Sequence, residues 1–83
     1  MIKGIKMITN FVLIQTKPGK ECDVYNQLLK IPEIKEYHQL FGEYDLIAKI
    51  DAEDIDKASQ IIIDKIRTIK NVIDTKTLLG LDW

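Results

Sequence analysis

The sequence predicts an α+β fold in which one four-stranded antiparallel sheet carries two helices on one face, in the chain order β-α-β-β-α-β. Two observations lead to this prediction. Strand-like and helix-like apolar patterns alternate along 83 residues, which is enough for a single domain. Residues 31–42 also correspond to residues 69–80 in their apolar, acidic and glycine positions, at a constant offset of 38 (from 31 to 69). Such a repeat indicates two similar β-α-β halves.

The first strand is predicted over Met7–Thr16, because Phe11–Ile14 form a short apolar run of β-prone residues. Pro18-Gly19 ends this strand. The first helix is expected over Lys20–Ile31, where apolar residues recur at helical spacing. Pro32 stops that helix, because proline has no N–H to continue the hydrogen-bond ladder.

Ile34–Phe41 and Tyr44–Asp51 are predicted to pair as a hairpin, because Gly42-Glu43 between them offers a tight reversal. Asp54–Ile69 has the strongest helical pattern, with isoleucines on one face and acidic residues at its start, as the helix dipole favours. Val72–Leu79 is expected to be the fourth strand. Two β-α-β halves whose helices pack back on one sheet make a ferredoxin-like fold.

The second face of the sheet is too apolar to face water. In the first strand Phe11 and Leu13 alternate with Val12 and Ile14, so large apolar groups are left outside whichever set meets the helices. A contiguous exposed apolar patch marks an interaction surface. The sequence therefore predicts a homodimer with two sheets packed back to back, a dimeric α+β barrel. The apolar tail that ends at Trp83 is expected to dock on a neighbouring subunit.

Composition excludes several classes of protein. The net charge of -1 argues against a nucleic-acid-binding module, and a single cysteine excludes a disulfide scaffold or a zinc cluster. No apolar run reaches the ~20 residues that cross a membrane. We expect a cytoplasmic protein that needs no metal and no cofactor. The single histidine, His38, and the single cysteine, Cys22, have no catalytic or ligating partner in the sequence, so no enzyme activity is expected.

Three side chains stand out as candidate binding groups. Asp45 enters an apolar strand directly after the reversal, so its carboxylate needs a backbone N–H, a hydroxyl or the ammonium group of a ligand. An aspartate that caps the turn is the simplest interpretation. Thr75 and Thr77 point to one face of the fourth strand. They are good strand residues, and they also offer two hydroxyls to a small zwitterion.

The element order, the Gly42-Glu-Tyr44-Asp45 turn and the Asp74-Thr75-Lys-Thr77 strand resemble the ligand-binding domain of the Lrp/AsnC (feast/famine) transcription regulators, also called the RAM domain. The resemblance runs from about residue 8 to residue 79. It implies dimers formed through the open sheet face, ring-like higher oligomers such as octamers, and an amino-acid effector bound between dimers. Carried over by position, the ligand-binding residues would be Gly42, Tyr44, Asp45, Thr75 and Thr77. Asp45 would meet the ammonium group, and Gly42 would let the carboxylate approach the backbone.

Full-length members of this family also carry an N-terminal helix-turn-helix domain, whereas about seven residues precede the first predicted strand here. We therefore expect a stand-alone amino-acid-binding and oligomerisation domain that does not itself bind specific DNA. Mixed assembly with full-length Lrp/AsnC regulators is a further hypothesis.

Three other kinds of protein share the fold. A small dimeric α+β barrel enzyme, of the monooxygenase or isomerase kind, would need an enclosed polar pocket around His38. An ACT-like amino-acid-binding module would bind its ligand at side-by-side helices. An acylphosphatase-like enzyme would need an arginine in the first loop, and Arg67 is the only arginine in the chain.

Overall fold

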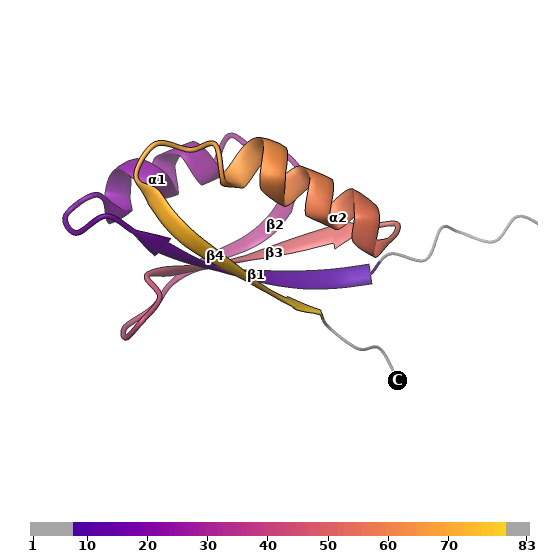
Figure 1. Cartoon of the computed structure of the whole chain (residues 1–83), viewed down its shortest axis with the longest axis horizontal. Helices are drawn as coiled ribbons and strands as arrows, with labels where there is room; N and C mark the ends of the chain where they lie inside the picture. The colour runs from indigo at the N-terminus through magenta and orange to yellow at the C-terminus, as the bar shows by residue number, and fades with distance from the viewer. Residues whose placement is uncertain (1–7, 80–83) are drawn as a thin grey trace, which may run out of the picture.

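The four strands form one antiparallel sheet in the order β2-β3-β1-β4, and both helices cover the same face of it (Figure 1). In this computed structural model, which describes residues 8–79, the central strands are β1 (Ile8–Thr16) and β3 (Leu46–Ala52). The edge strands are β2 (Ile34–Gln39) and β4 (Val72–Leu79). This confirms the predicted ferredoxin-like α+β fold. Met7 and the segment from Gly80 to Trp83, including the predicted docking of Trp83, lie outside the described residues.

The core lies between the sheet and the helices. β3 and, from Thr9 onward, β1 alternate between buried and half-buried residues, which is the two-residue period of a strand covered on one face. The buried cluster takes aliphatic side chains from every strand but β4, from α1 and the turn after it, and from the π-helical segment 62–66: Val12, Ile14, Val24, Leu28, Ile31, Ile34, Leu46, Ala48, Ile50, Ile62 and Ile66.

Helix α1 (Glu21–Leu28) is shorter than the predicted Lys20–Ile31. Its last residues leave the helix in a turn, where the N–H of Ile31 donates to the carbonyl of Leu28 at 3.0 Å. Because the residue before a proline disfavours the helical region, Pro32 constrains Ile31 and the helix ends earlier than the apolar pattern indicates.

The second helix begins as predicted and then changes its geometry. Asp54 caps α2 (Ile55–Ile61), its carboxylate accepting a 2.8 Å hydrogen bond from the N–H of Lys57. The chain then widens into a π-helical turn, η1 (Ile62–Ile66), in which the N–H of Arg67 reaches back to the carbonyl of Ile62 at 2.8 Å. The predicted continuous helix to Ile69 was therefore too long. The hydroxyl of Thr68 donates to the carbonyl of Asp64 at 2.8 Å and competes with the main-chain ladder there.

The connection between β2 and β3 is longer than the tight reversal that the sequence predicts. It runs over residues 40–45 and is closed by a 2.8 Å hydrogen bond from the N–H of Leu40 to the carbonyl of Asp45. Gly42 has a φ of +121°, which L side chains rarely adopt, so the expected role of glycine at this turn is confirmed.

The internal repeat is visible in the hydrogen bonds. The N–H of Ile34 donates to the carbonyl of Ile31 at 3.2 Å, and 38 residues later the N–H of Val72 donates to the carbonyl of Ile69 at 3.2 Å. These two bonds precede β2 and β4, so each helix is followed by the same entry into an edge strand. Neither helix in residues 8–79 is long and apolar enough to cross a membrane.

Candidate functional site

Asp45 is held against the end of β1 by two hydrogen bonds. Its backbone N–H donates to the carbonyl of Ile14 at 2.9 Å, and its carboxylate oxygen Oδ2 accepts from the N–H of Thr16 at 2.7 Å. Of the three partners that the sequence allows for this carboxylate, the structure therefore supplies a backbone N–H. The second oxygen, Oδ1, accepts no hydrogen bond from residues 8–79, so it can accept one from a further donor.

A hollow of about 390 Å³, called here the turn hollow, opens beside Asp45. Its walls come from the start of α1 and from the β2–β3 connection: Glu21, Cys22, Gln39, Leu40, Phe41, Gly42 and Asp45. This lining contains two carboxylates and no basic side chain. Phe41 stands fully exposed at the tip of the connection. The turn hollow thus combines a negative charge with an apolar edge, which suits a small cation.

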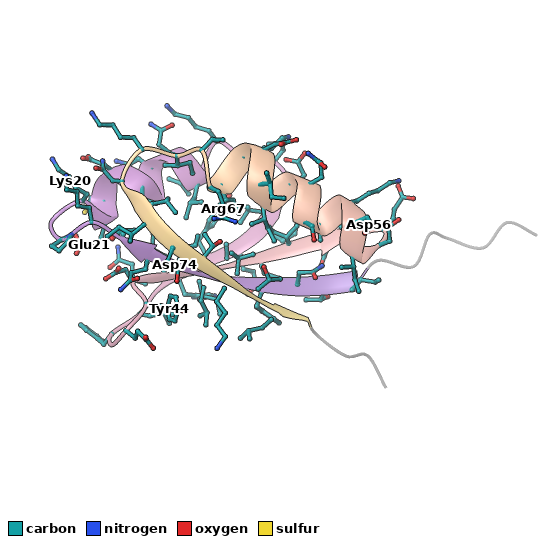
Figure 2. The ribbon with its side chains drawn as sticks, viewed as in Figure 1. Lys20, Glu21, Tyr44, Asp56, Arg67 and Asp74 are labelled. Carbon is teal, nitrogen blue, oxygen red and sulfur yellow. The ribbon has the colours of Figure 1, made fainter. Side chains whose placement is uncertain are left out.

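A second hollow of about 230 Å³, called here the strand hollow, lies between the second helix and β4. It is lined by Ser59, Ile62, Ile63, Arg67, Thr75 and Thr77. Thr75 pairs with Ile14 and Thr77 with Val12, so both threonines lie on the helix side of the sheet. Arg67 extends from the end of η1 towards β4 (Figure 2). One guanidinium and three hydroxyls with no carboxylate in the lining suit a small anion.

Tyr44 lies apart from both hollows, on the face of the sheet opposite the helices (Figure 2). Partial burial raises the pKa of its phenol above the ordinary value, and the negative charges of Asp74 and Glu43 raise it further. Asp74 pairs with Gln15 on this same face. Tyr44 therefore belongs to the surface on which the sequence predicts a dimer contact.

The five predicted ligand-binding residues thus fall into three places in one chain. Gly42 and Asp45 meet in the turn hollow, Thr75 and Thr77 meet in the strand hollow, and Tyr44 is on the open face. Strand β1 separates the two hollows, because β3 and β4 flank it on opposite sides. The two hollows share no lining residue, so the five residues do not form one pocket within a single chain.

Sequence reasoning missed two residues of these hollows. Arg67 was noted only as the single arginine. It follows a π-helical turn that the sequence pattern does not reveal, so its place beside β4 was not predicted. Glu21 is the first residue of α1, where an acidic residue is explained by the helix start alone. Its place beside Asp45 is therefore visible only in the folded chain.

The open face of the sheet, called here the sheet face, mixes an apolar centre with charged groups. The strand pairings place on it Thr9, Phe11, Leu13, Gln15, Glu36, His38, Ile47, Lys49, Asp51, Asp74, Lys76 and Leu78. Glu36 lies 3.5 Å from the His38 imidazole and 3.3 Å from the Lys49 ammonium. The hydrogen bond with His38 is the main cause that lowers the pKa of the Glu36 carboxyl, and the hydrogen bond with Lys49 lowers this pKa further.

The position of His38 bears on the enzyme alternative. Its side chain is 65% exposed on the sheet face, not enclosed between the sheet and the helices as that alternative requires. Within residues 8–79, no three side chains of His, Cys, Asp or Glu gather as a metal site would need.

Comparison with known proteins identifies relatives along nearly the whole chain. A family model described as the Lrp/AsnC ligand binding domain matches residues 9–82. An HTH-type transcriptional regulator of Pyrococcus abyssi is 36% identical over 77 residues, which are 89% of this chain and 51% of that protein. The structure of a hypothetical protein from Pyrococcus horikoshii superposes with a TM-score of 0.81 at 38% identity, covering 93% of both chains. Escherichia coli AsnC gives a TM-score of 0.85 at 26% identity, covering 90% of this chain and 51% of AsnC.

The chain spans about half the length of the curated relatives it matches. One enzyme is also similar: a homocitrate synthase from Sulfurisphaera tokodaii is 40% identical over 58 residues, which form 12% of that enzyme. The regulator from Pyrococcus abyssi matches a larger share of this chain, 89%, than the 70% that the homocitrate synthase matches.

Proposed function

The chain belongs to the family of Lrp/AsnC ligand-binding domains, and on that premise we propose that it senses a free amino acid as a homo-oligomer. The observation that carries the proposal is the pair of oppositely charged hollows. A free amino acid has an ammonium group and a carboxylate, and the turn hollow and the strand hollow each offer the complement of one of them.

In the proposed complex Asp45 binds the ammonium group through Oδ1, the oxygen that Thr16 leaves unused. Arg67 binds the carboxylate, and the hydroxyls of Thr75 and Thr77 orient it. Gly42 lets the ligand lie close to the backbone, since no side chain covers that position. Because β1 separates the hollows within one chain, the two halves of the site come from different subunits.

The sheet face supports the homodimer on which this site depends. Phe11, Leu13 and Ile47 form its apolar centre and are only half-buried in the single chain. At ~25 cal/mol per Å² of apolar surface, covering such a face stabilises a small domain by several kcal/mol. We propose that two sheet faces pack back to back and that the dimers then associate through the ends that carry the hollows, as an octamer or a similar ring.

A regulatory output follows if the amino acid changes how dimers associate. A ligand held between two dimers stabilises the assembled state by mass action. We propose that this assembly, with copies of this chain or with full-length Lrp/AsnC regulators, transmits the signal, and that the domain itself reads no DNA sequence.

A thermal-shift screen of the twenty amino acids tests the sensing role, with light scattering in parallel to measure molar mass. One amino acid or a small chemical group of them should raise the melting temperature, since a ligand at 100 times its dissociation constant adds ~2.7 kcal/mol. The molar mass should be a multiple of the dimer. A lone subunit at micromolar concentration, or a flat response to all twenty amino acids, would refute the proposal.

A further inference from the structure

A third hollow, of about 820 Å³, lies between α1 and η1 and is distinct from the turn hollow and the strand hollow. Five lysines line it: Lys17, Lys20, Lys30, Lys65 and Lys70. We call it the lysine groove. The described part of the chain has four other lysines, so this one groove gathers more than half of them.

The positive charge of the lysine groove is only partly compensated. Lys65 pairs with Glu33 at 2.6 Å, whereas the other four lysines have no acidic partner within 4.0 Å in residues 8–79. Asp23 and Asp64 also line the groove and offset part of the charge. Together with Glu33, three carboxylates oppose the five lysines and leave an excess of two positive charges, while the whole chain has a net charge of -1. Lysines crowded without counter-charges repel one another, and a bound anion removes that repulsion.

The backbone that carries Lys17 and Lys20 is fixed by main-chain hydrogen bonds. The N–H of Lys17 donates to the carbonyl of Asn71 at 2.8 Å, which ties the β1–α1 loop to the loop after η1. The N–H of Lys20 donates to the carbonyl of Lys17 at 2.9 Å and closes the turn before α1. Lys20 then extends from the start of α1 away from the sheet (Figure 2). A ligand therefore has to order only the lysine side chains and not the loops.

The lysines are spread along the groove. Lys20 and Lys30 flank the two ends of α1, whose eight residues span about 12 Å. A molecule with several phosphates in a row matches this spread of charges better than a single phosphate ion, because it reaches from one end of the groove towards the other. Lysine is a point charge suited to phosphate, and the lining contains no arginine for planar recognition of a carboxylate.

We propose that the lysine groove binds a small molecule that carries two or more phosphates, with a nucleoside di- or triphosphate as the chemical class. The volume of the groove lies within the ~300–1,000 Å³ typical of small-molecule sites. A nucleic-acid polymer fits less well, because the net negative charge of the chain repels a long polyanion that extends beyond the groove. The proposal does not depend on the amino-acid site.

Isothermal titration calorimetry with pyrophosphate and with ATP tests this site in the 83-residue chain. The variant Lys20→Gln/Lys70→Gln removes two groove charges, and Lys35→Gln/Lys57→Gln is the matched control, because those two lysines lie outside the groove. Both probes should bind the unmodified chain and the control with the same affinity. The groove variant should bind at least about tenfold more weakly, since hydrogen bonds to charged groups are the strong ones. Added salt should weaken binding to the unmodified chain.

Melting curves of all three proteins, which should be similar, show whether weaker binding comes from lost contacts or from lost folding. The proposal is overturned if neither probe binds at millimolar concentration, or if the control loses as much affinity as the groove variant. It is also overturned if a duplex DNA of random sequence binds the chain more tightly than ATP does, because the groove would then belong to a nucleic-acid surface.

Discussion

The carboxylate of Asp45 takes the place of a strand partner for Thr16. Ile14 and Leu46 are the last pair between β1 and β3, so no β3 residue stands opposite Thr16. Oδ2 of Asp45 accepts the Thr16 N–H at 2.7 Å, and Thr16 is only 4% exposed. Without Asp45 this N–H would be buried and unpaired, which is costly. The residue proposed to bind a ligand with one oxygen therefore holds the sheet together with the other.

Replacement of Asp45 by alanine is expected to lower the free energy of unfolding by about 1.5–3 kcal/mol, the range for a hydrogen bond to a charged group. Asp45→Asn should cost less, because the amide oxygen still accepts from Thr16. Urea denaturation of the two variants measures this difference. Glu43→Gln in the same connection is the control and should leave stability unchanged. Equal stability of Asp45→Ala and the unmodified chain would contradict the structural role.

Leu13→Glu is expected to break the proposed homodimer, because it places a charge in the apolar centre of the sheet face without touching the core beneath. Light scattering should then report the 9.6 kDa single chain. The matched control is Leu29→Glu, since Leu29 is 52% exposed at the end of α1 and away from the sheet face. An assembly that persists in Leu13→Glu but dissociates in Leu29→Glu would show that the helical layer forms the contact instead.

Arg67→Gln is expected to weaken binding of the effective amino acid by about tenfold or more, because the carboxylate loses its charged partner. Arg67→Lys should recover part of the affinity by restoring the charge without the planar fork. Titration calorimetry with the amino acid that gives the largest thermal shift measures both variants. Unchanged affinity in Arg67→Gln would remove the strand hollow from the site, and Lys57→Gln controls for the loss of a positive charge elsewhere on the second helix.

The pair between Glu33 and Lys65 should make stability depend on acid pH. The hydrogen bond from Lys65 lowers the pKa of the Glu33 carboxyl below its ordinary value of 4.5, with help from the backbone. A carboxyl whose pKa is lowered by folding stabilises the protein above that ordinary value, and the contribution is lost as the pH falls through the folded-state pKa.

Glu33→Gln should therefore be less stable than the unmodified chain at pH 7, by no more than about 1 kcal/mol for an exposed pair. The difference should shrink as the pH is lowered below about 4. Urea midpoints at several pH values measure it. Glu53→Gln, which removes the partner of Lys57 on α2, is the control. A difference that stays constant across the acid range would contradict this assignment.

The sequence predicted the strands and their order well, because two-residue alternation leaves little freedom once one face is buried. Val72–Leu79 was found with both ends correct, and β1 differs only at Met7, which lies outside the described residues. The hairpin was predicted too tight, since Asp45 stays in the connection, where its carboxylate accepts a hydrogen bond from the N–H of Thr16, a residue 29 positions away. Local patterns do not contain such a contact.

The candidate site was less predictable for a similar reason. Gly42 and Asp45 are neighbours in sequence and share a hollow, and the same is true of Thr75 and Thr77. Arg67 joins the threonines only because the second helix packs beside β4. The prediction that all five residues act on one ligand stays a prediction, since it requires a second copy of the chain.

The π-helical turn at η1 has a consequence for how this domain tolerates change. A turn that closes on the fifth residue holds one residue more than an ordinary helical turn. A single-residue deletion between Ile62 and Arg67 would bring these two residues to the ordinary four-residue spacing, so the N–H of Arg67 could still donate to the carbonyl of Ile62. The second helix can thereby lose one residue through one codon, while Asp54 still starts the helix and Arg67 still ends the turn.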